Sequence, residues 1–318
     1  MPNLSSYPGG FPGGVNILGM PVLNTYTGNV WWVNNASTGP GGSDSGKGTR
    51  ARPFATLDYA IGRCTASNGD LILVGPGHSE TIASAGAIAA DVAGITIMGL
   101  GAGRFRPTIN LGTATTASIT VSAANVRFTN MRFLSTFADV VTVFDVTAAG
   151  FTLDNCTLGD SAVNLNVLSA VKCTSTTDGN ANGIVLVNNR FISQDAATLG
   201  FVIFAADVLD AVIEDNQIVS EGTGLATIFT CATGKDIRMC SVQRNFLSSK
   251  ATSGNLAYSN DTASPNNSGV IAYNLVGHAD VTAGHILGVV GGCRMFANLS
   301  VSTDALSGFV IPAIDVDL

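Results

Sequence analysis

The chain has 318 residues, enough for two ordinary domains or one long repetitive one. Charged residues make up 12%, against roughly 25% in a typical soluble protein, and Asp+Glu (22) exceed Lys+Arg (15), which gives a net charge of −7. An acidic balance argues against nucleic-acid binding, which needs a basic face, and no apolar run approaches the roughly 18 residues of a membrane-spanning helix.

The first 48 residues differ in composition from the rest of the chain. Residues 1–24 (MPNLSSYPGGFPGGVNILGMPVLN) are rich in Gly and Pro, and their spaced apolar residues cannot form a core. They contain no basic start followed by an apolar stretch, so we expect no signal peptide and synthesis in a cytosol. We expect an extended arm that clasps neighbouring chains, with partner-binding residues Tyr7, Phe11, Val15, Ile17, Leu18, Met20 and Val22.

After the arm, residues 27–37 (TGNVWWVNNAS) predict a strand that enters the folded body, followed by a Gly-rich loop over 38–51. Residues 52–64 (RPFATLDYAIGRC) predict a short amphipathic helix. Thr56 suits its N-cap, and Leu57, Ala60, Ile61 and Cys64 fall on one face. We expect this helix to cap one end of the body.

Three apolar segments follow: GDLILVGPG (69–77), AGITIMGLGAG (93–103) and ASITVSA (117–123). Each predicts a strand, and we interpret them as three successive coils of a repeat. GLGAGR (99–104) superficially resembles a dinucleotide-binding glycine loop, but it lacks the following helix whose N-terminus would hold the pyrophosphate. We interpret it as a turn.

From residue 125 onward, short strands are punctuated by asparagine in the order φ-x-φ-x-x-N, where φ is apolar. The period varies around 24 to 34 residues, which indicates a solenoid or propeller. Both Trp residues lie at 31 and 32, outside the repeat, which disfavours propeller blades. We therefore predict an all-β parallel β-helix whose corners are marked by Asn130, Asn155, Asn189, Asn216, Asn245, Asn274 and Asn298.

Asparagine suits such corners for two reasons. It tolerates the left-handed backbone conformation better than most residues. Its amide can also donate to, and accept from, an equivalent amide one coil away, at the strand spacing of about 4.8 Å. We expect a ladder of inward-facing amides.

The six cysteines show no CxxC pair and predict neither a disulfide framework nor a zinc site. We interpret them as small buried apolar residues. Residues 305–318, which include the apolar run FVIPAI, predict a docking tail. The expected organisation is therefore an arm with an entry strand (1–48), a solenoid (49–304) and a C-terminal tail (305–318).

The segment GTRARPFATLDYAIGRC…GDLILVGPGHSETI, together with the asparagine-punctuated coils, resembles the right-handed parallel β-helix proteins of the pectate-lyase-like type. In that family a similar segment runs into a cap helix and then a first strand. The resemblance implies the fold. It implies little about function, because the fold carries lyases, hydrolases, viral tailspikes and passive structural proteins.

Polysaccharide hydrolases of this fold carry clustered Asp residues on neighbouring coils. This sequence contains no intact cluster of that kind. The best carboxylate candidates are Asp154 and Asp215, each one residue before an Asn, with Asn188 between them. Counting by asparagines puts the two carboxylates two coils apart, about 9 to 10 Å, at the upper edge of the inverting-glycosidase range. The favoured interpretation is an ordinary Asp/Asn stack, and no cofactor or metal site is predicted.

Two functions remain in competition. The favoured hypothesis is a non-enzymatic virion structural protein, a phage capsid decoration protein on the head surface, which binds the major capsid protein or other virion subunits. The β-helix virion proteins that this chain resembles are frequently trimers, and we therefore expect a homotrimer. The alternative is a carbohydrate-active β-helix, such as a tailspike-like hydrolase or lyase. A third hypothesis, a bacterial surface adhesin, is less favoured because we expect no export signal.

Overall fold

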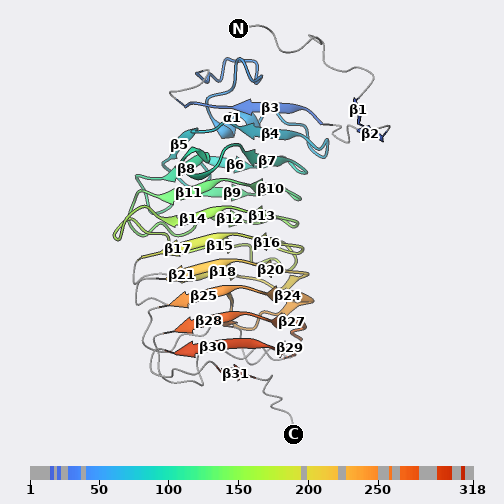
Figure 1. Ribbon diagram of the computed structural model, residues 1–318, viewed down its shortest axis with the longest axis vertical. Helices are drawn as coiled ribbons and strands as arrows, with labels where there is room; N and C mark the ends of the chain where they lie inside the picture. Colours follow the sequence, from blue (N-terminus) through green and yellow to red (C-terminus); the bar gives the residue numbers. More distant parts are fainter. Residues whose placement is uncertain are drawn as a thin grey trace.

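The computed structural model of the chain is an all-β parallel β-solenoid with one short α-helix in its described part (Figure 1). It describes residues 15–17, 20–22, 28–36, 41–194, 199–220, 227–249, 258–259, 266–278, 292–302 and 309–311. Three sheets run along the solenoid, and each complete coil contributes one strand to each sheet.

Two of the sheets have ten strands each, which follow one another along the solenoid. The first sheet contains β3 (Val30–Val33), β4 (Leu71–Val74), β7 (Thr96–Gly99), β10 (Arg127–Thr129), β13 (Thr152–Asp154), β16 (Val185–Val187), β20 (Val212–Glu214), β24 (Cys240–Gln243), β27 (Gly269–Ala272) and β29 (Cys293–Phe296). The second sheet contains β5 (Ser79–Ile82), β8 (Thr108–Leu111), β11 (Arg132–Ser135), β14 (Thr157–Asp160), β17 (Arg190–Ser193), β21 (Gln217–Ser220), β25 (Phe246–Ser249), β28 (Leu275–His278), β30 (Asn298–Ser302) and β31 (Phe309–Ile311).

The seven-stranded third sheet contains β6 (Ile88–Ala90), β9 (Ile119–Val121), β12 (Phe144–Val146), β15 (Ser169–Cys173), β18 (Gly200–Phe204), β22 (Phe229–Cys231) and β26 (Tyr258–Ser259). A small sheet pairs β19 (Val208–Leu209) with β23 (Ile237–Arg238). A 3-10 turn, η1, covers Gly103–Phe105.

The predicted strands at 69–77 and 93–103 are confirmed as β4 and β7, which pair in parallel as neighbours in the first sheet. The interpretation of 117–123 as a separate coil is wrong. Ile119–Val121 forms β9 in the third sheet, so this segment is the last side of the coil that begins with β7. Period-two alternation identifies a strand, but it does not say to which side of the coil the strand belongs.

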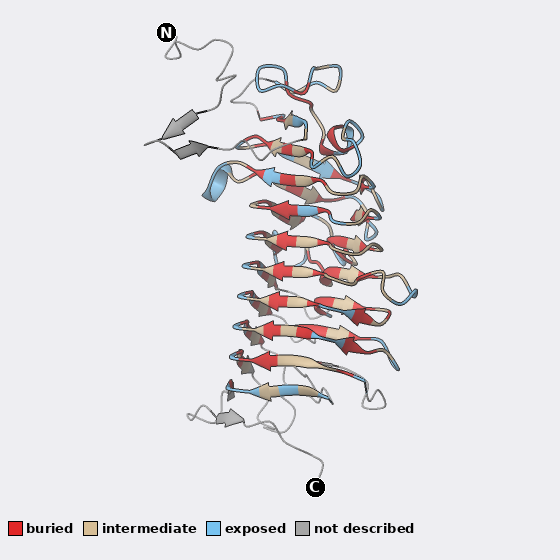
Figure 2. Ribbon diagram, turned by 90° about the vertical axis from the view of Figure 1, so that its right-hand side faces the viewer, coloured by how far each residue is buried: buried red, intermediate tan, exposed pale blue. Residues whose placement is uncertain are grey.

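Inward side chains alternate with outward ones along the strands, so buried residues recur at equivalent places in successive coils (Figure 2). In β10, β13, β16 and β20 the inward residues are Phe128, Leu153, Leu186 and Ile213, which stand in register one above the other. Stacking of like residues at the strand spacing fills the interior without a separate layer of helices.

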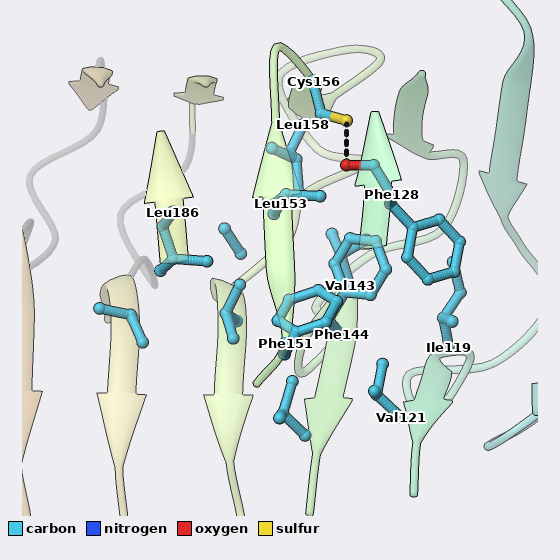
Figure 3. Close-up of a cluster of buried hydrophobic side chains, with 14 of the residues drawn as sticks. Ile119, Val121, Phe128, Val143, Phe144, Phe151, Leu153, Cys156, Leu158 and Leu186 are labelled. Carbon is cyan, nitrogen blue, oxygen red and sulfur yellow. Dashed lines mark hydrogen bonds between the residues drawn. The ribbon is translucent and has the colours of Figure 1, made fainter. Parts of the chain in front are cut away.

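Four phenylalanines pack together in this interior, and Figure 3 labels three of them, Phe128, Phe144 and Phe151. The Phe144 ring lies 4.8 Å from the ring of Phe133, 5.1 Å from that of Phe128 and 5.2 Å from that of Phe151, measured between centroids. All four side chains are fully buried. The Cys156 thiol lies beside them, donates to the Phe128 carbonyl at 3.9 Å, and has its pKa raised to about 12 by burial.

All six cysteines are free thiols. Four are buried, and Cys64 and Cys293 are half-buried.

Helix α1 (Leu57–Ile61) packs against β3, β4 and β6 and covers the first coils, as predicted for a cap. It is shorter than the predicted segment, and Thr56 does not cap it with its side chain. The Thr56 hydroxyl donates to Asp44 at 3.0 Å instead, while the backbone N–H of Leu57 is accepted by Glu80 at 2.9 Å. Carboxylates from two other segments therefore replace the local cap.

The side chain of Asp70 links three segments at the end of the solenoid that α1 covers. Its buried carboxylate accepts the backbone N–H of Asn29 at 2.6 Å, the backbone N–H of Thr65 at 2.7 Å and the Asn68 amide at 2.7 Å. Burial alone raises the pKa of this carboxyl, but the hydrogen bonds from Thr65, Asn29 and Asn68 outweigh burial and hold the pKa below its ordinary value. One side chain thus joins the entry segment, the segment after α1 and the first full coil.

We expect Asp70→Asn to lower the free energy of unfolding by about 1–3 kcal/mol at pH 7, because the amide leaves buried donors unmatched. A carboxyl whose pKa is lowered in the folded state contributes stability above its unfolded pKa of about 3.9, and this is lost as pH falls through the folded value. The deficit of the variant should therefore shrink below about pH 4. Urea unfolding from pH 7 to 3 measures it. Asp91→Asn, at an exposed carboxylate, is the control, and an equal deficit there would contradict this account.

The two ends of the chain are arranged differently. At the C-terminal end, β31 pairs antiparallel with β30 and covers its free edge. At the N-terminal end, β1 (Val15–Ile17) and β2 (Met20–Val22) pair antiparallel in a two-stranded sheet of their own, separate from the solenoid sheets. β3, the predicted entry strand, joins the first sheet beside β4, so the solenoid begins within residues 1–48.

Candidate functional site

The corner between the first and second sheets carries most of the predicted site residues. In successive coils one residue there has a positive φ, between 51° and 58°. These residues form a column along the outside of the solenoid. We call this column, together with the outward side chains next to it, the corner ridge. The column contains Asn130, Asn155, Asn188, Asp215, Arg244, Tyr273 and Ala297.

One residue further along each coil lies a second column, the asparagine ladder, which faces the interior. It contains Asn189, Asn216, Asn245, Asn274 and Asn298, all at least 98% buried. Asn216 illustrates the pattern: its Oδ1 accepts from the backbone N–H and the amide of Asn189 at 3.0 and 3.1 Å. Its own amide donates to Asn245 Oδ1 at 3.0 Å and to the Leu186 carbonyl at 2.8 Å. Every polar atom of its side chain is thus paired.

The seven predicted corner asparagines therefore divide into two sets. Asn130 and Asn155 have the left-handed backbone, but they lie one residue before the ladder, whose place in their coils is taken by Met131 and Cys156. Cys156 donates its backbone N–H to Asn189 Oδ1 at 2.9 Å. The other five asparagines form the ladder, and the left-handed conformation expected of them belongs to the residue before each one.

A sequence signal for this shift does exist. Each ladder asparagine follows the last inward strand residue by three positions, as Asn189 follows Leu186. Asn155 follows Leu153 by only two. Ile213 before Asn216 and Val242 before Asn245 show the three-residue spacing in the sequence, but Val187, which is also apolar, hides it at Asn189.

The shift also changes the placement of the two carboxylate candidates. Asp154 ends β13, and the register through Val187 puts it in line with Glu214, two strands further on. Asp215 belongs to the corner column, together with Asn188. The predicted stack of Asp154, Asn188 and Asp215 is therefore wrong, because its members come from two columns.

Each candidate carboxylate is paired with an arginine. Arg127 Nη2 lies 2.6 Å from Asp154 Oδ2, and the Asn188 amide donates to Asp154 Oδ1 at 3.4 Å. Arg244 holds Asp215 with two hydrogen bonds of 2.9 Å and Glu214 with one of 2.6 Å. The hydrogen bonds to Asp215, then those to Glu214, raise the pKa of Arg244 above its ordinary value. Each of these three carboxylates thus has an arginine partner, and the five groups together carry a net charge of −1.

An aromatic group continues the ridge toward the C-terminal end. Phe246, Tyr273 and Phe296 are 37%, 56% and 42% exposed, and the rings of Tyr273 and Phe296 meet edge to face at 5.6 Å. Phe246 lies on the outside, although most phenylalanines of the described strands are buried. Phe246 begins β25 and pairs with Leu275 in the next coil. The residues at the same position in earlier coils, Arg190 and Gln217, are exposed.

His78 is buried near the cap, where its Nδ1 accepts the backbone N–H of Asn35 at 3.1 Å and its Nε2 lies 3.3 Å from Glu80. His278 ends β28, and His285 lies outside the described residues. Among the arm residues, Val15, Ile17, Met20 and Val22 lie in β1 and β2, whereas Tyr7, Phe11 and Leu18 lie outside the described part.

A small cavity of about 180 Å³ lies in the loop between β3 and α1, lined by Gly41, Ser43, Ser45, Gly46, Ala51, Arg52 and Pro53. This is smaller than the roughly 300–1,000 Å³ of typical ligand pockets. Within the described ranges, no three His, Cys, Asp or Glu side chains are grouped to hold a metal ion, and no helix is long and apolar enough to cross a membrane.

Comparisons with known proteins yield one structural similarity. No protein-family model matches the chain, and no curated protein matches it. Among solved structures, a rhamnogalacturonan lyase aligns over 91% of this chain and 90% of its own, with 12% sequence identity and a TM-score of 0.39. A similarity of this size assigns neither a family nor an activity to the chain.

Proposed function

We propose that the chain is a non-enzymatic structural protein of a virion, a phage capsid decoration protein that binds the shell through its N-terminal arm. The observation that carries the proposal is the β1–β2 sheet, which pairs with itself and joins none of the solenoid sheets. The expected partners are the major capsid protein or other virion subunits, and the expected assembly is a homotrimer on the capsid surface.

The physical reason lies in the size of this sheet. A single two-stranded hairpin is marginally stable in water and needs a further surface to pack against. Its register pairs Val15 with Val22 and Ile17 with Met20, apolar residue with apolar residue. A sheet with this composition that pairs with none of the solenoid sheets suits a segment that becomes ordered on a neighbouring chain.

The solenoid supplies the second element of the proposal, a stiff body. Its first and second sheets each run through ten strands, and the asparagine ladder ties successive coils together inside. Such a rod can bridge neighbouring shell subunits without a catalytic group. Each carboxylate of the corner ridge named above is paired with an arginine, which suits a surface that faces solvent.

Deleting residues 1–24 is expected to lower binding to shells at least tenfold while leaving the melting temperature of the solenoid unchanged, because β3 and the coils remain intact. Co-sedimentation with shells that lack the protein measures binding, and circular dichroism measures folding. The quadruple variant of Val15, Ile17, Met20 and Val22 to Ser should reproduce the loss. Asn16→Ser is the matched control. Undiminished binding by the deletion variant would overturn the proposal.

A carbohydrate-active β-helix remains the second candidate because Phe246, Tyr273 and Phe296 expose aromatic rings on the corner ridge. Aromatic rings on such a ridge suit stacking against sugars. Incubation with bacterial polysaccharides, followed by an assay for released sugars, tests it. The structural proposal expects no release by the wild type. Release that is lost in Asp154→Ala or Asp215→Ala, and weaker binding by Tyr273→Ala, would favour the second candidate.

A further inference from the structure

Two thiols meet near the C-terminal end of the solenoid across a glycine. Cys240 begins β24 and Cys293 begins β29, and the register pairs both with Gly269 of β27, which lies between them. The two Sγ atoms are 3.8 Å apart. A Cβ added at Gly269 would lie 2.2 and 2.4 Å from the backbone O and N of Cys240 and 2.8 Å from its Sγ, so a residue with a side chain does not fit between the two cysteines.

This arrangement is too wide for a disulfide. Two strand spacings separate Cys240 from Cys293, about 9.6 Å between backbones, whereas disulfide-bonded residues have Cα atoms at most about 6.8 Å apart. The sulfurs would also have to close from 3.8 Å to about 2.05 Å. Because β27 occupies the space between β24 and β29, these strands cannot move together without breaking its pairing.

The same arrangement suits one ion held between two opposed sulfurs. With a metal–thiolate bond of about 2.3 Å, such sulfurs lie about 4.6 Å apart, so each would move outward by about 0.4 Å. Thiolates select soft cations, and within the described part of the chain the side-chain partner of each sulfur is the other sulfur.

The surroundings favour the same class of ion. Cys240 is 3% exposed, and Cys293 packs with Met295 against the hydrophobic core. A charged group is costly in such a place. Two thiolates that share one mercuric ion carry no net charge, and with one silver or cuprous ion they carry a single negative charge. These ions are therefore favoured in the order mercuric before silver or cuprous, and all of them over harder ions that would keep their water.

We propose that Cys240 and Cys293 bind one soft, two-coordinate cation of the mercuric, silver or cuprous class, which bridges β24 and β29 across Gly269. On binding, each S–H bond breaks and each sulfur forms one bond to the ion. The two protons pass to solvent, and no electron is transferred. The bound ion ties the last coils to one another and raises the stability of this end of the solenoid.

The test uses the full-length, reduced protein with Hg²⁺ or Ag⁺ as the probe, in the presence of an excess of a competing monothiol. The competitor removes ions from single cysteines, whereas two thiols held together retain theirs by their high effective concentration. After desalting, the metal content per chain is measured by elemental mass spectrometry, and the melting temperature by circular dichroism. We expect one retained ion in the wild type and a higher melting temperature.

Cys240→Ala and Cys293→Ala should each lower retention at least tenfold, whereas Cys231→Ala, which removes another buried thiol, should not. If Cys240→Ala does not fold, Cys293→Ala decides alone, because its thiol is half-buried in the last strand of the first sheet. Equal retention by wild type and Cys293→Ala overturns the proposal, as does a wild type that retains no ion. A Cys240–Cys293 disulfide after mild oxidation, seen as a loss of two hydrogens in that peptide pair, also overturns it.

Discussion

Asn216→Ala is expected to lower the free energy of unfolding by about 4 kcal/mol. The substitution removes the acceptor of the Asn189 backbone N–H and amide, and the donor to the Leu186 carbonyl. Each buried polar group left unpaired costs about 1–3 kcal/mol, and these groups lie in an interior that water does not reach. Because the ladder links coil to coil, the loss falls in the middle of the solenoid and weakens both halves.

Urea unfolding followed by circular dichroism measures this effect. Asn155→Gly is the matched control, because Asn155 lies in the corner column, is exposed, and has a φ of 51° that glycine adopts without strain. Its hydrogen bonds to Arg106 and Asn130 are both 3.4 Å long, so we expect a change of less than about 1 kcal/mol. Similar unfolding midpoints for the two variants would show that the ladder does not stabilise the coils.

Phe144→Ala should destabilise the protein by about 3–5 kcal/mol, the usual cost of deleting a buried phenylalanine ring. The Phe144 ring contacts those of Phe133, Phe128 and Phe151 and is fully buried, so its removal leaves a cavity that its neighbours on stacked strands cannot readily fill. Thermal and urea unfolding of the variant measure the loss.

Phe105→Ala is the control for size and chemistry. Phe105 ends η1, is half exposed, and packs its ring under the Arg104 guanidinium at 4.8 Å. We expect that variant to lose less than about 1 kcal/mol, since a single cation–π contact at an exposed site contributes about 0.5–1 kcal/mol. If Phe144→Ala were no more destabilising than Phe105→Ala, the aromatic cluster would not be part of the core.

The sequence predicts much of the fold because a solenoid repeats one local rule. Alternating apolar residues and a repeating asparagine were sufficient to predict stacked parallel strands, and the apolar face within residues 52–64 predicted the cap helix. The errors came from register. Counting from Asn155 to Asn189 joined two columns that differ by one residue, and this misplaced Asp154 relative to Asp215.

Other features depend on that register and on backbone detail. The pairing of Arg244 with Glu214 and Asp215 joins residues 30 and 29 positions apart, which a correct coil count could have suggested. The contact between Cys240 and Cys293 spans two strand spacings and depends on the bare backbone of Gly269. Pattern alone could not show that the strand between them leaves room for the sulfurs. The capping of α1 by Asp44 and Glu80 likewise comes from distant segments.

The most direct test of the proposed function is a single-particle map of the protein in its assembly. The proposal predicts density for β1 and β2 packed against a neighbouring shell subunit, with the solenoid bridging adjacent subunits and the corner ridge empty. A map in which this hairpin contacts no other chain, while a glycan occupies the ridge beside Tyr273 and Phe246, would contradict it.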